Sequence, residues 1–393
     1  MINFNKHVKV GILGAGTMGA GIAQVAATAG HNVILCDSNS EALDKSINSI
    51  AAGLIKLVEK GKIEKIEADN ILSRITKTDD INNFSQCGMI IEAIVENLEV
   101  KQKVFQQIES IVKGTCFLAT NTSSISIGSI ASACKNPERI VGLHFFNPAN
   151  IMPLVEIVPS ILTDKNVVDI LYELMKEWKK VPVAAKDTPG FIVNKVARPF
   201  YGEALRIYEE GIASFEEIDH AMKKFGGFKM GPFELMDLIG NDVNYKVTET
   251  VFTEFYFDGR YKPSITQKRY AEAGLLGRKS GRGFYDYQNP RTKSEPEIDN
   301  AKAKEIFERI LVMLINEAVD TLHRNIASKE DIDLAVTKGV NYPKGLLRWA
   351  DEIGTEKVFY QLKSLYDIYF EERYRPSPLL RKMALKGMNF FND

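Results

Sequence analysis

The stretch from Gly142 to Val158 carries two side chains that together could move a proton. His144 lies in an apolar run over residues 140–146, which predicts a buried strand. Two prolines then interrupt the chain before a second apolar strand, over residues 154–158, which carries Glu156. Strands joined by a turn can bring such side chains face to face, and a carboxylate held against an imidazole makes a common general base. On periodicity alone, a hydrogen-bonded core histidine near a glutamate on a strand edge is the more frequent arrangement.

A glycine-rich turn near the N-terminus is the second chemical feature. A short apolar strand over residues 8–13 runs into the GxGxxG of residues 14–19, and an alanine-rich helix over residues 18–29 follows. The first glycine permits a tight turn, the second lets the backbone approach a pyrophosphate, and the third lets helix and strand pack closely. The free N–H groups at the start of the helix bind phosphates. We expect cofactor contacts from Gly14, Gly16, Thr17, Met18 and Gly19.

The second predicted strand, over residues 32–36, ends in Asp37, 23 residues after Gly14. A carboxylate at this place accepts hydrogen bonds from the ribose hydroxyls of adenosine. It would also repel a 2′-phosphate, so the sequence predicts NAD rather than NADP. Because the glycine turn stands between a strand and a helix, a turn without a ligand is the minor alternative.

The composition of the chain argues against several classes of protein. The chain has 393 residues, enough for two or three domains, with a net charge of −1 and 45% hydrophobic residues. This balance gives no reason to expect nucleic acid or an anionic membrane as partner, and no apolar run approaches the roughly 20 residues of a membrane span. The four cysteines lack metal-ligand spacing. We therefore expect no metal, reduced thiols, no targeting peptide and a cytoplasmic location.

The remaining elements predict an open α/β sheet followed by a helical region. Two charged helices, over residues 41–60 and 65–71, form an arm after the second strand. Further strands are predicted over residues 89–91, 116–119, 140–145, 154–158 and 181–185. Polar residues follow the carboxyl ends of several strands, where such sheets bind ligands. A turn at residues 187–190 marks the boundary, and one long helix over residues 191–210 follows.

The last hundred residues repeat the preceding hundred. IASFEEIDHAM, from Ile212, matches IASKEDIDLAV, from Ile326, at an offset of 114 residues. The same offset relates Glu203-Ala204 to Glu317-Ala318, Asp237 to Asp351 and Gly240 to Gly354. A constant offset over this length predicts a duplicated helical domain. The second copy differs at polar positions, because Glu308 stands where the first has Asn194, and the glycine-rich loop of residues 277–284 has no full counterpart.

Six segments resemble, in the same order, the motifs of the 3-hydroxyacyl-CoA dehydrogenase family: GAGTMGAGIAQVAA, IIEAIVENLEVK, NTSSISI, GLHFFNP, LVEIV and DTPGFIVN. The resemblance covers nearly the whole chain. It implies NAD-dependent interconversion of L-3-hydroxyacyl-CoA and 3-ketoacyl-CoA, in fatty-acid β-oxidation or short-chain 3-hydroxybutyryl-CoA metabolism. It also implies a Rossmann-type NAD-binding domain at 1–187 with a helical arm at about 41–72, and two tandem all-α domains at 188–288 and 298–393. The tandem copy resembles the arrangement in bacterial fatty-oxidation multienzyme subunits.

The resemblance assigns roles to individual residues. The family's catalytic histidine and its glutamate partner match His144 and Glu156, and its active-site serine and asparagine match Ser123 and Asn194. In addition to the glycine turn, the residues with which the family binds its cofactor match Asp37, Glu96, Lys101, Ser123, Asn147 and Lys279 in this sequence. Lys60, at the end of the arm helix, matches a coenzyme A contact, whereas Gly53 stands where the family has a serine contact.

Three alternatives were weighed. A crystallin-like sugar-acid (gulonate-type) 3-dehydrogenase shares the His–Glu pair but needs no coenzyme A, and the basic arm ending at Lys60 favours coenzyme A. The intact His144 and Glu156 argue against a non-catalytic protein that only binds NAD. The chain has no excess of basic over acidic residues, which argues against nucleic-acid binding. We expect an acyl-CoA substrate, no nucleic-acid or membrane partner, and either a monomer with an internal pseudo-dimer or a homodimer. An enoyl-CoA hydratase or a thiolase is a candidate partner.

Overall fold

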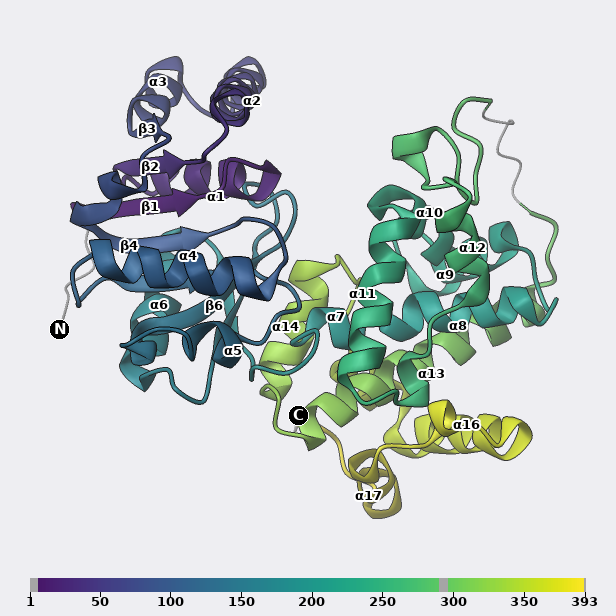
Figure 1. Ribbon diagram of the computed structural model, residues 1–393. Coiled ribbons are helices and arrows are strands. Elements are labelled where there is room, and N and C mark those ends of the chain that lie inside the picture. Colours follow the sequence, from purple (N-terminus) through teal and green to yellow (C-terminus); the bar gives the residue numbers. More distant parts are fainter. Residues whose placement is uncertain (1–5, 290–295, 392–393) are drawn as a thin grey trace. The chain divides into compact units, whose positions relative to one another are not determined.

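A computed structural model describes residues 6–289 and 296–391. The chain divides into two compact units, Met1–Thr188 and Pro189–Asp393. The first unit is a sheet with helices and the second consists of helices (Figure 1). The predicted α/β region followed by a helical region is confirmed at this level. Residues 289–297, which separate the two predicted helical domains, lie mostly outside the described residues.

The first unit is built around an eight-stranded sheet of order β3-β2-β1-β4-β5-β6-β7-β8. The strands are β1 (Lys9–Leu13), β2 (Val33–Cys36), β3 (Ile75–Thr78), β4 (Cys87–Glu92), β5 (Phe117–Thr120), β6 (Ile140–Phe145), β7 (Leu154–Pro159) and β8 (Val181–Ala184). All neighbours are parallel except β6 and β7, which form an antiparallel pair. Most residues of β1 and β4 to β7 are buried, as expected where helices cover both faces of a sheet.

Helices connect these strands, and two of them form the predicted arm. They are α1 (Thr17–Thr28), α2 (Ser40–Glu59), α3 (Lys65–Ser73), α4 (Leu98–Ile111), α5 (Ile127–Ala131) and α6 (Lys165–Glu177), with short 3-10 turns η1 (Ile81–Gln86) and η2 (Pro137–Arg139). The arm helices α2 and α3 lie side by side at the β3 end of the sheet (Figure 1). The sequence analysis missed β3, so the strand predicted third in the sheet is β4. Residues of β3 are half-buried or exposed, and the sequence ITKT contains no apolar run that would reveal a strand.

The second unit is helical throughout the part that the structure describes. Its helices are α7 (Val193–Val196), α8 (Arg198–Glu209), α9 (Phe215–Gly226), α10 (Pro232–Ile239), α11 (Asn241–Glu254), α12 (Ile265–Glu272), α13 (Asn300–His323), α14 (Lys329–Gly339), α15 (Leu346–Ile353), α16 (Thr355–Tyr369) and α17 (Pro378–Lys386), with 3-10 turns η3 (Gly259–Tyr261), η4 (Arg278–Ser280) and η5 (Glu372–Tyr374). The single helix predicted over residues 191–210 is wrong. It is divided at Ala197, because Pro199 has no N–H to continue the helical hydrogen bonds and its ring crowds the preceding turn.

Helix α13 runs through the core of the second unit. It packs against α8, α9, α15, α16 and α17. The middle of α13, over residues 310–321, is buried all round, which is typical of a helix enclosed by others. The two halves of the helical region therefore share one core. Within the described residues, no helix combines the length and the apolar character needed to cross a bilayer.

Candidate active site

His144 and Glu156 face each other across the β6–β7 hairpin. The strand register pairs them directly, and Nδ1 of His144 lies 2.6 Å from Oε2 of Glu156. Glu156 is fully buried and His144 is 7% exposed. When Nδ1–H donates to the carboxylate, the lone pair that can take a proton lies on Nε2. The predicted approach of the two side chains is confirmed, and their catalytic role stays a prediction.

Two residues that the sequence analysis did not single out hold this hairpin in place. Nζ of Lys180 donates to the carbonyl oxygens of Ala149 and Met152 in the loop between the strands, the latter at 2.9 Å. Burial lowers the pKa of Lys180 to about 8. Oδ1 of Asn121, which follows β5, accepts from the backbone N–H of Phe145 at 2.8 Å. No pattern in the sequence predicts these hydrogen bonds of Lys180 and Asn121, because each partner lies more than twenty residues away along the chain.

Glu96 organises the loop that carries Ser123. Its Oε1 accepts from the hydroxyl of Thr122, from the backbone N–H of Ser123 at 3.1 Å and from the hydroxyl of Ser124 at 3.0 Å. Burial acts to raise the pKa of Glu96, but the charge of Lys101 and these hydrogen bonds outweigh it, so the pKa is lowered. The side chain remains 38% exposed, so the ionised carboxylate can also accept from a ligand.

Lys101 lies beneath this loop and is buried. Its Nζ lies 2.6 Å from Glu92 and 3.3 Å from Glu96, and its side chain is 1% exposed. Glu92 is fully buried and also accepts from the Thr120 hydroxyl at 2.7 Å. A lysine bound to two carboxylates in this way holds Glu96 in position, and the predicted contact of Lys101 with the cofactor stays a prediction. The sequence analysis missed Glu92, because a single acid at a strand end has no distinctive spacing.

The glycine turn forms a close-packed cradle with one open side. Gly14 has φ +104°, and a Cβ atom there would lie 2.5 Å from the Ala93 carbonyl oxygen. A Cβ atom on Gly19 would lie 1.8 Å from the Gly14 carbonyl oxygen. A Cβ atom on Gly16 would meet nothing within 4 Å, so the turn is open where Gly16 begins α1. An open turn at an uncapped helix start fits a pyrophosphate, which the N–H groups of residues such as Thr17 and Met18 would bind.

Asp37 lies at the end of β2 and is bonded to the same turn. Its Oδ2 accepts from the backbone N–H of Ala15 at 2.7 Å, and its Oδ1 accepts from that of Asn39 at 2.9 Å. The carboxylate is half-buried and keeps further lone pairs for ribose hydroxyls. A 2′-phosphate at this place would meet its negative charge. The geometry thus fits the predicted preference for NAD.

The other predicted site residues lie on the surface of the first unit or in the second unit. Asn147 is exposed at the start of the loop after β6, and Lys60 is exposed at the C-terminal end of α2. In the second unit, Nζ of Lys279 lies 2.6 Å from Asp242. Asn194, in α7, is half-buried, and its backbone carbonyl accepts a hydrogen bond from Arg198.

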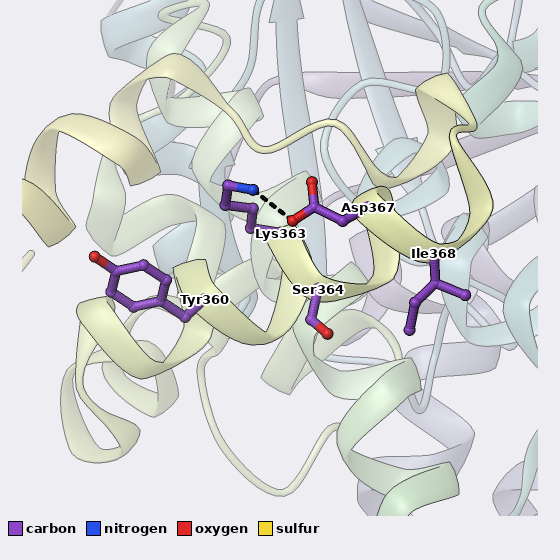
Figure 2. A pocket seen from close by; sticks show the side chains of 5 residues that line it. All are labelled: Tyr360, Lys363, Ser364, Asp367 and Ile368. Carbon is purple, nitrogen blue, oxygen red and sulfur yellow. Dashed lines mark hydrogen bonds and ion pairs between the residues drawn. The ribbon is translucent and has the colours of Figure 1, made fainter.

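A hollow on the second unit contains none of these residues (Figure 2). Its lining comes from α16 alone and consists of Tyr360, Lys363, Ser364, Asp367 and Ile368. The lysine and the aspartate of this set are hydrogen-bonded to each other one turn apart. Because its two charged side chains bind each other, we assign the hollow no function. Within the described ranges, no cluster of histidine, cysteine and acidic side chains could hold a metal ion.

Family models identify the class of protein that has this fold and site. The model described as 3-hydroxyacyl-CoA dehydrogenase, NAD binding domain, matches residues 9–188. The model of the C-terminal domain of the same enzymes matches residues 190–287 and 306–389. The chain therefore belongs to the 3-hydroxyacyl-CoA dehydrogenase family, and the predicted cofactor, NAD, is confirmed at the level of the family.

The similarity to individual relatives extends over most of the chain. The 3-hydroxyadipyl-CoA dehydrogenase of Escherichia coli (strain K12) is 39% identical, over 96% of this chain and 97% of that protein. The 3-hydroxybutyryl-CoA dehydrogenase of Clostridioides difficile is 42% identical, over 71% of this chain and 99% of that protein. A crystal structure of 3-hydroxybutyryl-CoA dehydrogenase from Escherichia coli K12 superposes with a TM-score of 0.92 at 38% identity, covering 98% of this chain and 99% of that one.

Proposed function

We propose that the chain is an NAD-dependent L-3-hydroxyacyl-CoA dehydrogenase that interconverts L-3-hydroxyacyl-CoA and 3-ketoacyl-CoA. Family membership supports this reaction over the sugar-acid alternative, since the relatives cited above are all named for coenzyme A thioesters. The observation that carries the proposal is the buried His144–Glu156 pair at 2.6 Å in the unit that has the nucleotide cradle. The relatives' names include both a butyryl and an adipyl acyl group, one ending in a methyl and the other in a carboxylate.

The proposed mechanism divides the work between cofactor and protein. NAD, held by the glycine turn and Asp37, would supply the hydride-transfer chemistry at C3 of the acyl chain. His144 takes the proton of the 3-hydroxyl on Nε2 during oxidation and returns it during reduction. Glu156 fixes the ring and stabilises the imidazolium. Ser123 and Asn194 hydrogen-bond substrate oxygens as their charge changes, and Glu96 keeps the Ser123 loop in position.

We assign the remaining predicted contacts as follows. The glycine turn binds the pyrophosphate and Asp37 the ribose. Glu96, Ser123, Asn147 and Lys279 are proposed as further cofactor contacts. Lys101 is proposed to act through Glu96, because its ammonium is buried between two carboxylates. Lys60 is proposed to bind coenzyme A, since an exposed cation at the end of an arm can reach a phosphate.

We further propose that the helical region is a duplication, with the second copy acting as an internal dimer partner. Helices α14, α15 and α16 follow one another as α9, α10 and α11 do, and the C-terminal family model matches both halves. Buried contacts between the halves support an isologous pairing. Lys195 binds Glu317 as Arg309 binds Glu203, and Tyr261 donates to Glu317 as Tyr374 donates to Glu203.

The sequence offset relates these paired contacts to one another. Arg309 and Glu317 lie 114 residues after Lys195 and Glu203, and Tyr374 lies 113 residues after Tyr261. Since Asn194 and Lys279 have no polar equivalents of the same type in the second copy, we propose one active site per chain. The cytoplasmic location and a hydratase or thiolase partner stay predictions.

The reaction is tested by NADH consumption with acetoacetyl-CoA and longer 3-ketoacyl-CoA substrates. We expect His144→Gln to lose at least ~10²-fold in kcat with NAD binding kept. Glu156→Gln should lose no more than this, and the double variant should not be additive because the two residues act as a unit. His323→Gln, an exposed histidine at the end of α13, is the matched control. Near-native turnover in His144→Gln would refute the mechanism.

A further inference from the structure

Lys180 places a cation against the loop that joins β6 to β7. The loop spans residues 146–153, and Nζ of Lys180 donates to two of its carbonyl oxygens, that of Ala149 and that of Met152, the latter at 2.9 Å. Among the described residues, no acidic side chain forms an ion pair with this lysine, and burial lowers its pKa. A half-buried ammonium without a carboxylate partner costs free energy, so packing alone does not explain why a lysine stands here.

The backbone that carries Lys180 is fixed by a helix end and a strand. Its N–H donates to the carbonyl oxygen of Met175 at 2.9 Å, which closes the C-terminal turn of α6. The next residue, Val181, begins β8, and its N–H donates to the carbonyl oxygen of Pro153 at 2.8 Å. The side chain of Lys180 therefore reaches the loop from a support that does not depend on the conformation of the loop.

The same loop is bonded to α1, the helix that begins at the nucleotide cradle. Nδ2 of Asn150 donates to Oε1 of Gln24 at 3.0 Å. Nearly one turn earlier in α1, a Cβ atom on Gly21 would lie 3.0 Å from the Cβ of Ala149, so the backbone of the helix and the loop are in close contact. Gly21 follows Gly16 by five residues, about 7.5 Å along the helix. The loop thus connects the cradle to the strands that carry the histidine and the glutamate.

A hairpin loop of this length needs contacts from outside to hold one conformation. Two-residue turns fix the register of the strands by themselves, whereas longer loops do so less strictly. Inside this loop, the carbonyl oxygen of Pro148 accepts from the N–H groups of Ile151 and Met152, both at 2.9 Å. Ala149 is 1% exposed, and an unpaired carbonyl is costly in such a place. We therefore expect the ammonium of Lys180 to hold the loop in this conformation.

Three residues of the proposed site lie in this loop or next to it. Asn147 is part of the loop, His144 lies five residues before Ala149 on β6, and Glu156 lies four residues after Met152 on β7. A shift of the loop would move Asn147 and disturb the contact of 2.6 Å between the histidine and the glutamate. Misplacing a reacting group by about 1 Å can lower a rate by about 10²-fold.

We propose that Lys180 is a positioning residue for proton transfer: it holds the loop of residues 146–153 so that His144 keeps its place relative to the cofactor bound at α1. The proposal rests on the proposed function and adds a residue to the same site. Lys180 acts through the backbone of the loop and contacts neither substrate nor cofactor. Since burying its charge costs free energy, removing it should lower activity far more than stability.

The test compares Lys180→Met with the native protein by NADH consumption with acetoacetyl-CoA and by thermal unfolding. We expect kcat at saturating NADH to fall by about 10- to 10²-fold, because the histidine is no longer held in place. The melting temperature should change by less than about 4 °C, since the two lost hydrogen bonds are offset by an ammonium that no longer has to be buried. Lys176→Met removes a lysine of α6 whose side chain is 50% exposed, and it should match the native protein in both measurements.

A kinetic cycle with His144 separates positioning from a general structural effect. In a His144→Gln background, Lys180→Met should lower kcat by less than about 2-fold, because the loop then has no base to place and the two residues act as a unit. A lysine that only stabilises the first unit would affect both backgrounds by the same factor.

Lys180→Gln keeps the test decisive if Lys180→Met does not fold. Glutamine is neutral and one bond shorter than lysine, but its amide can still donate to a carbonyl oxygen, so kcat should fall by about 3- to 10-fold. Native kcat in the folded variants, or an equal loss of kcat in both His144 backgrounds, would overturn the proposal. Native protein that consumes NADH neither with acetoacetyl-CoA nor with longer 3-ketoacyl-CoA substrates would instead overturn the dehydrogenase function.

Discussion

Replacing Glu317 with glutamine should loosen the contact between the two helical halves. Glu317 is the partner of two buried cations, Lys195 and Arg260, with Arg260 Nη1 at 3.7 Å. Their side chains are 0% and 4% exposed. Glutamine keeps the shape of the side chain and an oxygen that can accept from Tyr261. It removes the charge, however, and leaves Lys195 with Asp320 alone, at 3.3 Å, whereas Arg260 keeps Asp320 at 3.2 Å and Asp258 at 2.8 Å.

The ion pairs around Glu317 determine how much the free energy of unfolding should fall in Glu317→Gln. Removing one partner of a buried ion pair costs about 3–5 kcal/mol, because the other charge stays buried. Asp320 still faces both cations, so we take the lower end, about 3 kcal/mol. For a unit of about 200 residues, each kcal/mol shifts the melting temperature by about 2–4 °C, so the expected fall is about 6–12 °C.

The equivalent substitution in the first helical half, Glu203→Gln, should lower the free energy of unfolding by less. In Glu203→Gln, Arg309 keeps Glu210 as a partner at 2.9 Å, and its side chain is 11% exposed. We expect a loss of about 1–2 kcal/mol there, since the remaining pair is intact and partly solvated. Lys363→Met breaks a pair on α16 whose side chains are 48% and 55% exposed, and it should cost less than about 0.5 kcal/mol.

Tryptophan fluorescence can report this contact selectively. The chain has two tryptophans, Trp178 in the first unit and Trp349 in the second. Trp349 packs between Phe228 of the first helical half and Phe307 of the second, with ring centroids at 6.1 Å and 5.8 Å. In a Trp178→Phe background, denaturant unfolding followed through Trp349 therefore measures separation of the halves. A midpoint for Glu317→Gln no lower than that of Lys363→Met would refute the reasoning.

Three further predictions concern the cofactor, pH and the repeat. Asp37→Ser should lower the ratio of kcat/KM for NADH over NADPH by about 10-fold or more, because the carboxylate no longer repels a 2′-phosphate; a native protein that uses both equally would contradict this placement. Burial acts to raise the pKa of Asp320, but cations led by Lys195 outweigh it and lower the pKa to about 2. This lies below the unfolded value of about 3.9, so the stabilisation is present above that value and should fade as pH falls from about 4 to 2. The difference in unfolding free energy between the native protein and Asp320→Asn should shrink over that range, and a constant difference would argue against the ion cluster. A fragment ending before Pro296 should expose apolar surface and dimerise or precipitate in sedimentation experiments, whereas a monomeric and fully active fragment would refute the pseudo-dimer.

The parts of the site that the sequence predicted depend on local patterns. Two apolar runs separated by prolines were enough to predict that His144 and Glu156 could face each other, because register in a short hairpin fixes which side chains meet. The glycine turn was equally predictable, since its GxGxxG pattern lies within one strand–turn–helix unit. Lys101 could not be placed in this way. Its ammonium binds Glu92 at the end of β4, and Glu92 in turn accepts from Thr120 of β5. No spacing in the sequence encodes that arrangement.

The helical repeat separates polar residues that the fold requires from those that it does not. Asp237 accepts from the backbone N–H groups of Phe284 and Tyr285, at 3.0 Å and 2.9 Å. Its equivalent, Asp351, accepts in the same way from Phe390 and Phe391, at 2.8 Å and 2.9 Å. The second copy therefore keeps this anchoring aspartate and its two backbone partners.

A buried polar residue that recurs in both copies, with the same partners, serves packing and is no evidence of chemistry. The converse identifies candidates for function. Asn194 is replaced by Glu308 and Arg198 by Val312 in an otherwise similar helical setting. Because the repeat folds around either residue of each pair, the fold does not require Asn194 or Arg198 at these positions.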